Sequence, residues 1–137
     1  MSSKVVEANT GVHSLAMAVA PVTSWRLYDS IYTERYMNLP DLNPGGYVNA
    51  SISNVTAFNN FNYLLAHGSG DDNVHYSNSA HLLDMFTQHK VRGFRFRMFT
   101  DRCVFFLLLW VGRGKLMGFV VTIVFQGVEG TGRFMSI

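Results

Sequence analysis

Nine consecutive residues, His67-Gly-Ser-Gly-Asp-Asp-Asn-Val-His75, bring together two histidines, two glycines and two adjacent carboxylates. They directly follow the apolar run Phe61–Ala66. Glycines allow the chain to turn sharply because they lack a Cβ atom. A carboxylate on such a turn, at the edge of a sheet, can hold a histidine in one tautomer for acid–base chemistry. The stretch therefore predicts the acid of a catalytic site, which still requires a nucleophile and a base.

A second group of residues suited to a binding site is aromatic. Trp25, Tyr28, Tyr32 and Tyr36 recur at spacings of three and four, which places them on one face of a helix. We expect this helix to cover Trp25–Met37, with Ser24 as its N-cap. By spacing alone such a stripe is more often core packing than a ligand pocket, and both interpretations remain open at this point.

Apolar segments along the chain indicate the elements that must position these residues. Runs that end in proline or glycine are typical of buried strands, whereas alternating aromatic and arginine residues indicate a half-buried strand. The predicted order is a helix end at Ser3–Glu7, a strand at Leu15–Pro21, the aromatic helix, a loop at Leu39–Gly46, a strand at Asn62–His67, a helix at Asn73–Lys90 and a strand at Gly93–Thr100. Strands that alternate with helices predict an α/β fold with a mostly parallel sheet.

The composition limits the class of protein. The 137 residues allow one domain, and a hydrophobic content of 48% is sufficient for a packed core. The formal net charge of +2 gives no reason to expect a nucleic-acid partner. The single cysteine, Cys103, excludes an internal disulfide bond, and the polar start Ser2–Asn9 is not a signal peptide.

Three segments in order, Val19–Trp25, Tyr28–Met37 and His67–His75, closely resemble the catalytic domain of the dipeptidyl peptidase IV-like enzymes of the prolyl oligopeptidase family. The resemblance is nearest to fungal members and covers about residues 1–101. It implies a partial α/β-hydrolase fold, the C-terminal part of the sheet with its covering helices. It also implies that the chain is a fragment of a serine peptidase that releases X-Pro or X-Ala dipeptides from peptide N-termini.

The resemblance implies a role for each matching residue. Asp71, the first of the adjacent carboxylates, corresponds to the acid of the Ser-Asp-His triad. Asn73 corresponds to the residue that binds the substrate carbonyl near the scissile bond. A small apolar pocket for proline or alanine is implied at Val22, Trp25, Tyr28, Tyr32 and Val74. No cofactor and no metal are implied, and the intact parent is expected to bind such peptides and to be able to form a homodimer.

Two parts of that triad have no counterpart in the sequence. No serine lies in a Gly-x-Ser-x-Gly context. Ser69 lies on the turn that carries Asp71, within His67–His75, which we call the acid turn. No histidine follows His89, and we interpret His67 and His75 as structural because a metal site would need a third ligand. We therefore expect the chain to be inactive alone. A non-catalytic module that pairs with an intact family member is the alternative, and another α/β hydrolase, such as an esterase, is a third hypothesis.

Residues 102–137 differ in character from the preceding segment. The apolar runs Val104–Val111 and Leu116–Phe125 approach the length of a membrane span when joined, but Arg113 and Lys115 lie between them. Each charge would cost about 2.5–3.5 kcal/mol in a membrane, which disfavours a span. We assign no domain to this tail. We expect it to be translated from an intron or a shifted frame and not to continue the sheet.

Asn49-Ala-Ser51 and Asn54-Val-Thr56 are acceptor sequons for N-glycosylation, although such short motifs are common by chance. They agree with the family, whose members are secreted or membrane-anchored. The resemblance therefore implies a parent that enters the secretory or vacuolar pathway.

Overall fold

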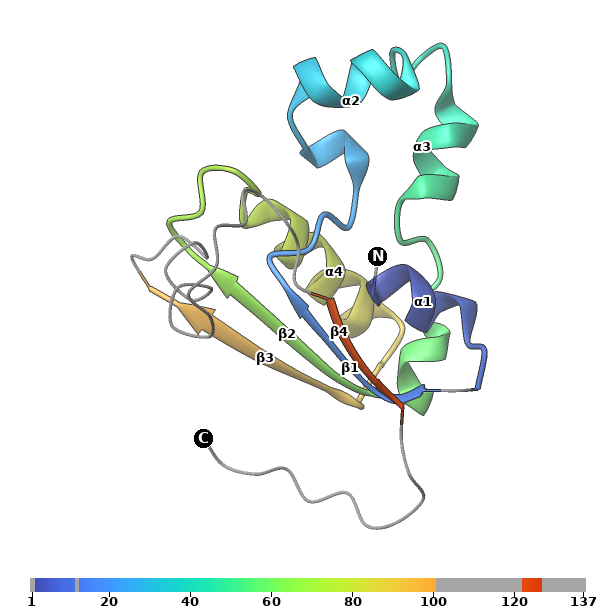
Figure 1. The fold of residues 1–137 in the computed structure, drawn as a ribbon, viewed down its shortest axis with the longest axis vertical. Helices are drawn as coiled ribbons and strands as arrows, with labels where there is room; N and C mark the ends of the chain where they lie inside the picture. Colours follow the sequence, from blue (N-terminus) through green and yellow to red (C-terminus); the bar gives the residue numbers. More distant parts are fainter. Residues whose placement is uncertain (1, 12, 101–121, 127–137) are drawn as a thin grey trace.

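The computed structural model describes residues 2–11, 13–100 and 122–126, which form one four-stranded sheet and its helices (Figure 1). In chain order the elements are α1 (Ser2–Ala8), β1 (His13–Val19), the 3₁₀ turn η1 (Trp25–Leu27), α2 (Ser30–Met37), α3 (Pro44–Ala50), the 3₁₀ turn η2 (Thr56–Asn60), β2 (Asn62–Gly68), α4 (Ser77–Gln88), β3 (Phe94–Phe99) and β4 (Thr122–Gln126). The predicted alternation of strands and helices is confirmed.

The sheet has the order β3-β2-β1-β4, and its first three strands are parallel. In the register of β1 and β2, Val19 lies opposite Ala66. Because parallel strands end at the same edge of a sheet, the segments that follow β1 and β2 leave from one edge (Figure 1). Those two segments carry the acid turn and the aromatic residues.

The core lies on the face of the sheet that the helices cover. Tyr63 and Leu65 of β2 are buried in one cluster with Phe58 of η2 and Phe86 of α4. The ring of Tyr63 lies 4.9 Å from that of Phe58 and 6.0 Å from that of Phe86. Its hydroxyl shares a 2.8 Å hydrogen bond with Ser3 of α1, and burial raises the pKa of Tyr63. Three segments distant in sequence therefore converge on β2, the strand that precedes the acid turn.

The aromatic helix is shorter than predicted. Tyr28 is extended, and α2 begins after Asp29 because the Asp29 side chain accepts a hydrogen bond from the N–H of Ile31 at 3.2 Å. Ser24 precedes η1, but its side chain makes no capping bond, so it is not the N-cap of a long helix. The aromatic residues are therefore divided between a 3₁₀ turn and a helix.

The predicted loop at Leu39–Gly46 is interrupted by the start of α3. The side chain of Asn43 accepts a hydrogen bond from the N–H of Gly46 at 3.1 Å, which caps the helix. Pro44 stands in the first turn, where its missing N–H removes no helical bond. A segment rich in proline and glycine thus begins a helix.

The expectation that residues 102–137 do not continue the sheet is wrong for Thr122–Gln126. These residues form β4, antiparallel to β1, with Val124 opposite Ala16. The pairing covers an edge of β1 whose N–H and C=O groups would otherwise be open to another strand.

Other predictions for the tail concern residues that the structure does not describe. Val104–Val111 and the part of Leu116–Phe125 before Thr122 lie outside the described residues. Within the described part of the chain, no helix is long and apolar enough to cross a membrane.

Candidate active site

The acid turn follows the carboxyl end of β2. Asp71 is 6% exposed, and its Oδ1 accepts hydrogen bonds from the N–H groups of Asn73 at 3.1 Å and Val74 at 3.0 Å. A short polar side chain that binds the backbone two and three residues later stabilises such a turn. Among the described residues nothing donates a hydrogen bond to Oδ2 of Asp71. Asp72 is exposed, so the two carboxylates occupy different environments.

His67 contacts the acid turn through the carbonyl group of Val74 and is fully buried. Its Nε2 lies 2.8 Å from the carbonyl oxygen of Val74, and its Nδ1 lies 2.6 Å from Oγ of Ser79. Because a carbonyl only accepts, Nε2 carries the proton and Nδ1 accepts from the Ser79 hydroxyl. Burial lowers the pKa of His67, and this outweighs the opposing effects of the Val74 carbonyl and of Asp71. A neutral His67 with both nitrogens in use matches the structural role expected from the sequence.

Asn78 lies on α4, the helix that follows the acid turn, and binds the segment that carries Trp25. The sequence analysis did not predict this role. Its side-chain Oδ1 accepts from the N–H groups of Thr23 at 3.1 Å and Ser24 at 3.2 Å, and its Nδ2 donates to the carbonyl of Leu27 at 2.9 Å. Oγ1 of Thr23 donates to the backbone carbonyl of Asn78 at 2.6 Å. Asn78 and Thr23 are both buried. Asn78 stands four residues before Leu82 and eight before Phe86, so it shares the buried face of α4 with them, and this spacing was the signal in the sequence.

The aromatic residues form a connected group outside the core. Trp25 and Tyr32 are stacked with ring centroids 6.4 Å apart, and Tyr28 lies edge-on to both at 5.8 Å. Tyr32 is 50% exposed and Tyr36 68% exposed. None of the four belongs to the hydrophobic core, so the interpretation of this stripe as ordinary core packing is wrong.

The remaining pocket residues lie on the two segments that leave the same edge of the sheet. Val22 is half-buried in the segment after β1, whereas Val74 is buried beneath the acid turn. Asn73 is exposed, and its side chain makes no hydrogen bond within the described residues. Ala20 directly after β1 has a φ of +43°, a left-handed conformation that is costly for alanine. Its N–H donates to the carbonyl of Ala66 at 2.8 Å, which ties this bend to β2.

The two sequon asparagines, Asn49 at the end of α3 and Asn54 before η2, are exposed. Oδ1 of Asn54 accepts from the N–H and Oγ1 of Thr56, at 3.0 and 2.6 Å. A search of the described residues finds no group of three or more histidine, cysteine or acidic side chains that could hold a metal ion.

A parallel sheet with helical crossovers and a buried carboxylate on the turn after one strand is the arrangement of an α/β hydrolase. The sequence model of the prolyl oligopeptidase family matches residues 1–102. The chain belongs to the prolyl oligopeptidase family, as the sequence motifs predicted.

Individual relatives support the same assignment. Proteins named "Probable dipeptidyl-aminopeptidase B" from Neurospora crassa and Sclerotinia sclerotiorum are 50% and 52% identical over 103 residues, which cover 74% of this chain and 11% of each relative. The crystal structure of Porphyromonas gingivalis dipeptidyl peptidase 4 is 36% identical with a TM-score of 0.59, over 66% of this chain and 13% of that one. This chain therefore spans only a small part of the length of these relatives.

Proposed function

We propose that residues 1–101 supply the triad acid and the substrate pocket of a serine-type dipeptidyl peptidase that releases X-Pro and X-Ala dipeptides. The main observation that supports this proposal is the turn at Asp71. It buries one carboxylate at the edge of the sheet from which the aromatic segment also leaves. Membership of a peptidase family supports the class of reaction.

In this proposal Asp71 acts through a histidine. The two N–H groups that bind Oδ1 hold the carboxylate in place. Its Oδ2 then accepts a hydrogen bond from Nδ1–H of the base, which fixes the tautomer whose Nε2 can take a proton from the serine hydroxyl. Asp72 is too exposed to hold a histidine in a dry site.

The aromatic residues serve as the pocket for the second residue of the substrate. Three rings that contact one another at right angles or in a stack form a rigid apolar wall with little side-chain entropy to lose. A proline ring or an alanine methyl group is small and apolar enough for such a wall. The side-chain amide of Asn73, which has no hydrogen bond to the described residues, is suited to donate one to a substrate carbonyl.

The chain by itself is proposed to be inactive. Its five histidines all precede β3, and both nitrogens of His67 are already in use. No serine stands in a Gly-x-Ser-x-Gly context. Triad members act as a unit, so an acid without its partners supplies little rate acceleration. The purified chain is expected to hydrolyse Ala-Pro-p-nitroanilide no faster than buffer alone does.

The role of Asp71 is tested in a chimaera that carries residues 1–101 of this chain in place of the matching segment of the Neurospora crassa relative. Asp71→Asn is expected to lower kcat on Ala-Pro-p-nitroanilide by about 10³–10⁴-fold. The matched control Asp72→Asn should change it by less than about threefold, as expected for an exposed neighbour. If both variants lose activity alike, or if neither does, Asp71 is not the triad acid.

A further inference from the structure

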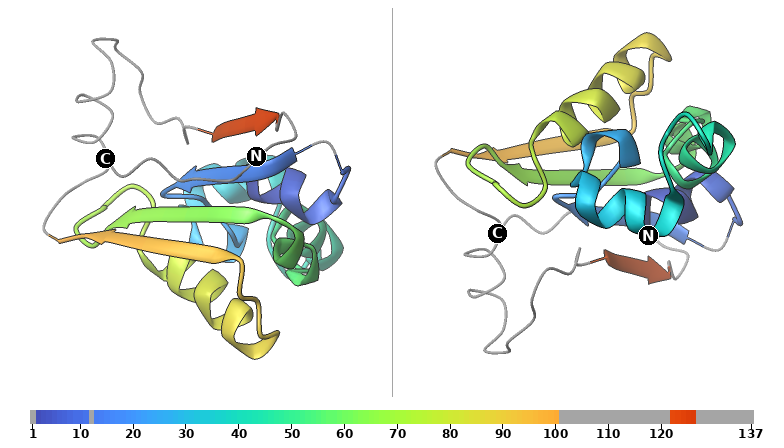
Figure 2. Two further views of the ribbon diagram at one scale, coloured as in Figure 1. Left: turned by 90° about the horizontal axis from the view of Figure 1, so that it is seen from below. Right: turned by 90° about the horizontal axis from the view of Figure 1, so that it is seen from above.

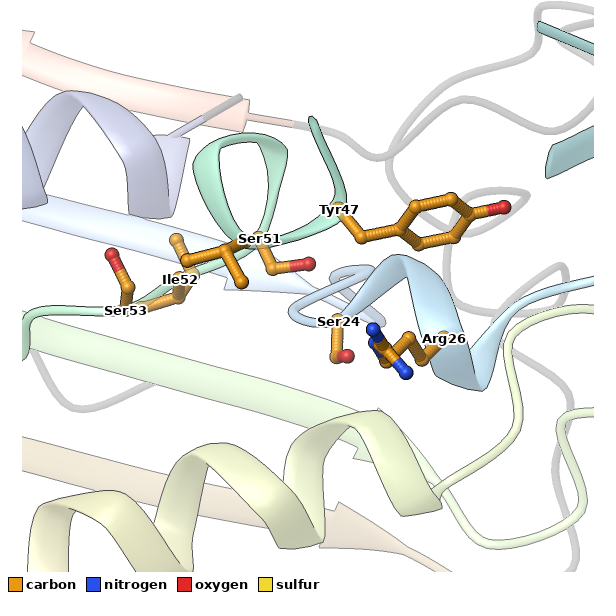
Figure 3. Close-up of a pocket in the computed structure, with 7 residues that line it drawn as sticks. Ser24, Arg26, Tyr47, Ser51, Ile52 and Ser53 are labelled. Carbon is orange, nitrogen blue, oxygen red and sulfur yellow. The ribbon is translucent and has the colours of Figure 1, made fainter. Parts of the chain in front are cut away.

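A small pocket lies beside the turn η1 (Figure 3). Its volume is about 190 Å³. It is lined by one cation, three hydroxyl groups and three larger side chains: Arg26, Ser24, Ser51, Ser53, Tyr47, Val48 and Ile52. Sites for drug-sized ligands hold about 300–1,000 Å³, so this pocket suits only a molecule of a few heavy atoms.

The charged group of the pocket is not neutralised by a neighbour. The Arg26 guanidinium lies 5.8 Å from the ring centre of Tyr47, and it makes no ion pair within the described part of the chain. Stacking on the ring holds the guanidinium while leaving its N–H groups available. Figure 3 shows the side chains of Arg26 and Ser24 next to each other.

Two hydroxyl groups of the pocket have hydrogens to donate. The Ser24 side chain makes no hydrogen bond within the described residues. Oγ of Ser51 accepts the N–H of Trp25 at 3.0 Å, which leaves its own hydrogen free. These two hydroxyls and the guanidinium line the same small pocket, and all three can donate hydrogen bonds.

The carboxylate that binds the pocket residue Ser53 has its own partners. Oε1 of Glu7 accepts from the N–H and hydroxyl of Ser53 and from the N–H of Asn54, at 2.9, 3.1 and 2.6 Å. Oε2 of Glu7 pairs with Nζ of Lys4 at 2.5 Å. Glu7 is thus neutralised by Lys4 and does not compete for Arg26, so the pocket keeps a positive character.

We propose that this pocket binds a small carboxylate, such as the end group of an amino acid or short peptide. The planar guanidinium of Arg26 matches the two oxygens of a carboxylate, and the Ser24 and Ser51 hydroxyls can donate further hydrogen bonds. Ile52 and Val48 then contact a short aliphatic portion. The proposal does not depend on the peptidase role of the chain.

Occupation of the pocket should be visible at Trp25. Its backbone N–H binds Ser51, and its Nε1 donates to the carbonyl of Ala50 at 3.2 Å. Trp25 and Trp110 are the two tryptophans. In the full-length chain carrying Trp110→Phe, the one remaining indole N–H resonance therefore reports on the pocket wall.

The experiment follows that resonance by NMR while sodium propionate replaces sodium chloride at constant ionic strength. A saturable shift with a millimolar Kd is expected. Arg26→Gln should weaken binding at least tenfold. Arg35→Gln is the matched control, because Arg35 also stacks on a tyrosine ring, at 5.9 Å from Tyr36, but lies outside the pocket. That variant should bind propionate as the parent does.

Ser24→Ala keeps the proposal testable if Arg26→Gln does not fold, and a several-fold weaker Kd is expected for it. A shift that does not saturate by 100 mM propionate overturns the proposal. Equal effects of the Arg26 and Arg35 variants overturn it as well, because binding would then be non-specific charge attraction. Tighter binding of inorganic phosphate than of propionate would overturn the assignment to a carboxylate.

Discussion

Asp71 and Asp72 have the same side chain and lie on one turn, but the backbone of that turn places them in different environments. The N–H groups of Asn73 and Val74 converge on Asp71 and hold it at a buried position. Asp72 points to solvent and has no such constraint. A carboxylate must be fixed in order to orient a base, because a mobile one selects no tautomer.

His67 makes a prediction for stability against pH. Burial lowers its pKa below the ordinary value of 6.5, so the folded chain keeps His67 neutral while the unfolded chain protonates it as the pH falls through about 6.5. The free energy of unfolding should therefore be smaller at pH 5.5 than at pH 7.5. Urea unfolding of the parent and of His67→Gln measures the effect, and the variant should show a weaker pH dependence.

His81 of α4 is exposed and serves as the control for this measurement. His81→Gln should retain the pH dependence of the parent. If the free energies of unfolding of His67→Gln and the parent differ by the same amount at both pH values, the protonation of His67 does not contribute to the pH dependence.

Tyr32 and Tyr36 test the assignment of the pocket, since they lie next to each other with ring centres 4.9 Å apart. In the chimaera with the Neurospora crassa relative, Tyr32→Ala should lower kcat/KM for Ala-Pro-p-nitroanilide. The expected loss of transition-state binding free energy is about 1–3 kcal/mol. Tyr36→Ala removes the ring that lies outside the assigned pocket and should have little effect. Equal losses in the two variants would assign both rings to general packing.

At the scale of elements, the acid turn and the aromatic turn act as one unit because Asn78 joins them. Its side chain binds two N–H groups and one carbonyl of the segment after β1, while its helix α4 begins just after the acid turn. A buried amide that satisfies several backbone groups therefore sets the position of Trp25 relative to Asp71.

Asn78→Ala should lower the free energy of unfolding by about 3 kcal/mol, because it leaves the buried N–H of Thr23 and the carbonyl of Leu27 without this partner. The Trp25 indole resonance should broaden or shift in the same variant. Asn60→Ala, at an exposed position in η2, should change the free energy by less than about 0.5 kcal/mol. Urea unfolding and NMR measure the two effects, and an unperturbed Trp25 resonance in Asn78→Ala would contradict the coupling.

At the scale of the whole molecule, the helices among the described residues cover one face of the sheet. Ala16, Tyr63 and Phe94 lie in register on the face that α1, η2 and α4 cover (Figure 2). The alternate residues face the other side, where Arg95 and Arg97 are exposed. Mostly parallel sheets usually have both faces covered. The described residues therefore supply the helices of one face of this sheet.

The edge strand β4 gives a paired prediction. N–H groups along an edge strand alternate between its partner and solvent, so only one of Ile123 and Val124 can donate to β1. Proline lacks this N–H. One of Ile123→Pro and Val124→Pro should therefore speed amide exchange in β1 by about tenfold, a loss of about 1.4 kcal/mol, while the other is tolerated. If neither proline changes the exchange of β1, the pairing of β4 is not stable in solution.

The sequence alone determined the features that depend on local pattern. Glycines and carboxylates after an apolar run marked the acid turn, apolar periodicity marked most of the strands and helices, and three motifs identified the family. Each of these signals lies within about 20 neighbouring residues. For the same reason, the environments of Asp71 and Asp72 could not be separated by composition, only by the resemblance.

The tertiary structure decided what depends on partners distant in the chain. Asn78 lies more than 50 residues from Thr23, and Arg26 meets Ser51 only because α3 returns beside η1. The exposure of Tyr32 and the pairing of β4 with β1 likewise follow from where other elements lie. Burial and pairing are properties of the folded arrangement, whereas periodicity is a property of the local chain. A stripe of aromatic residues has the same spacing in a core and on a surface, so only the fold could distinguish them.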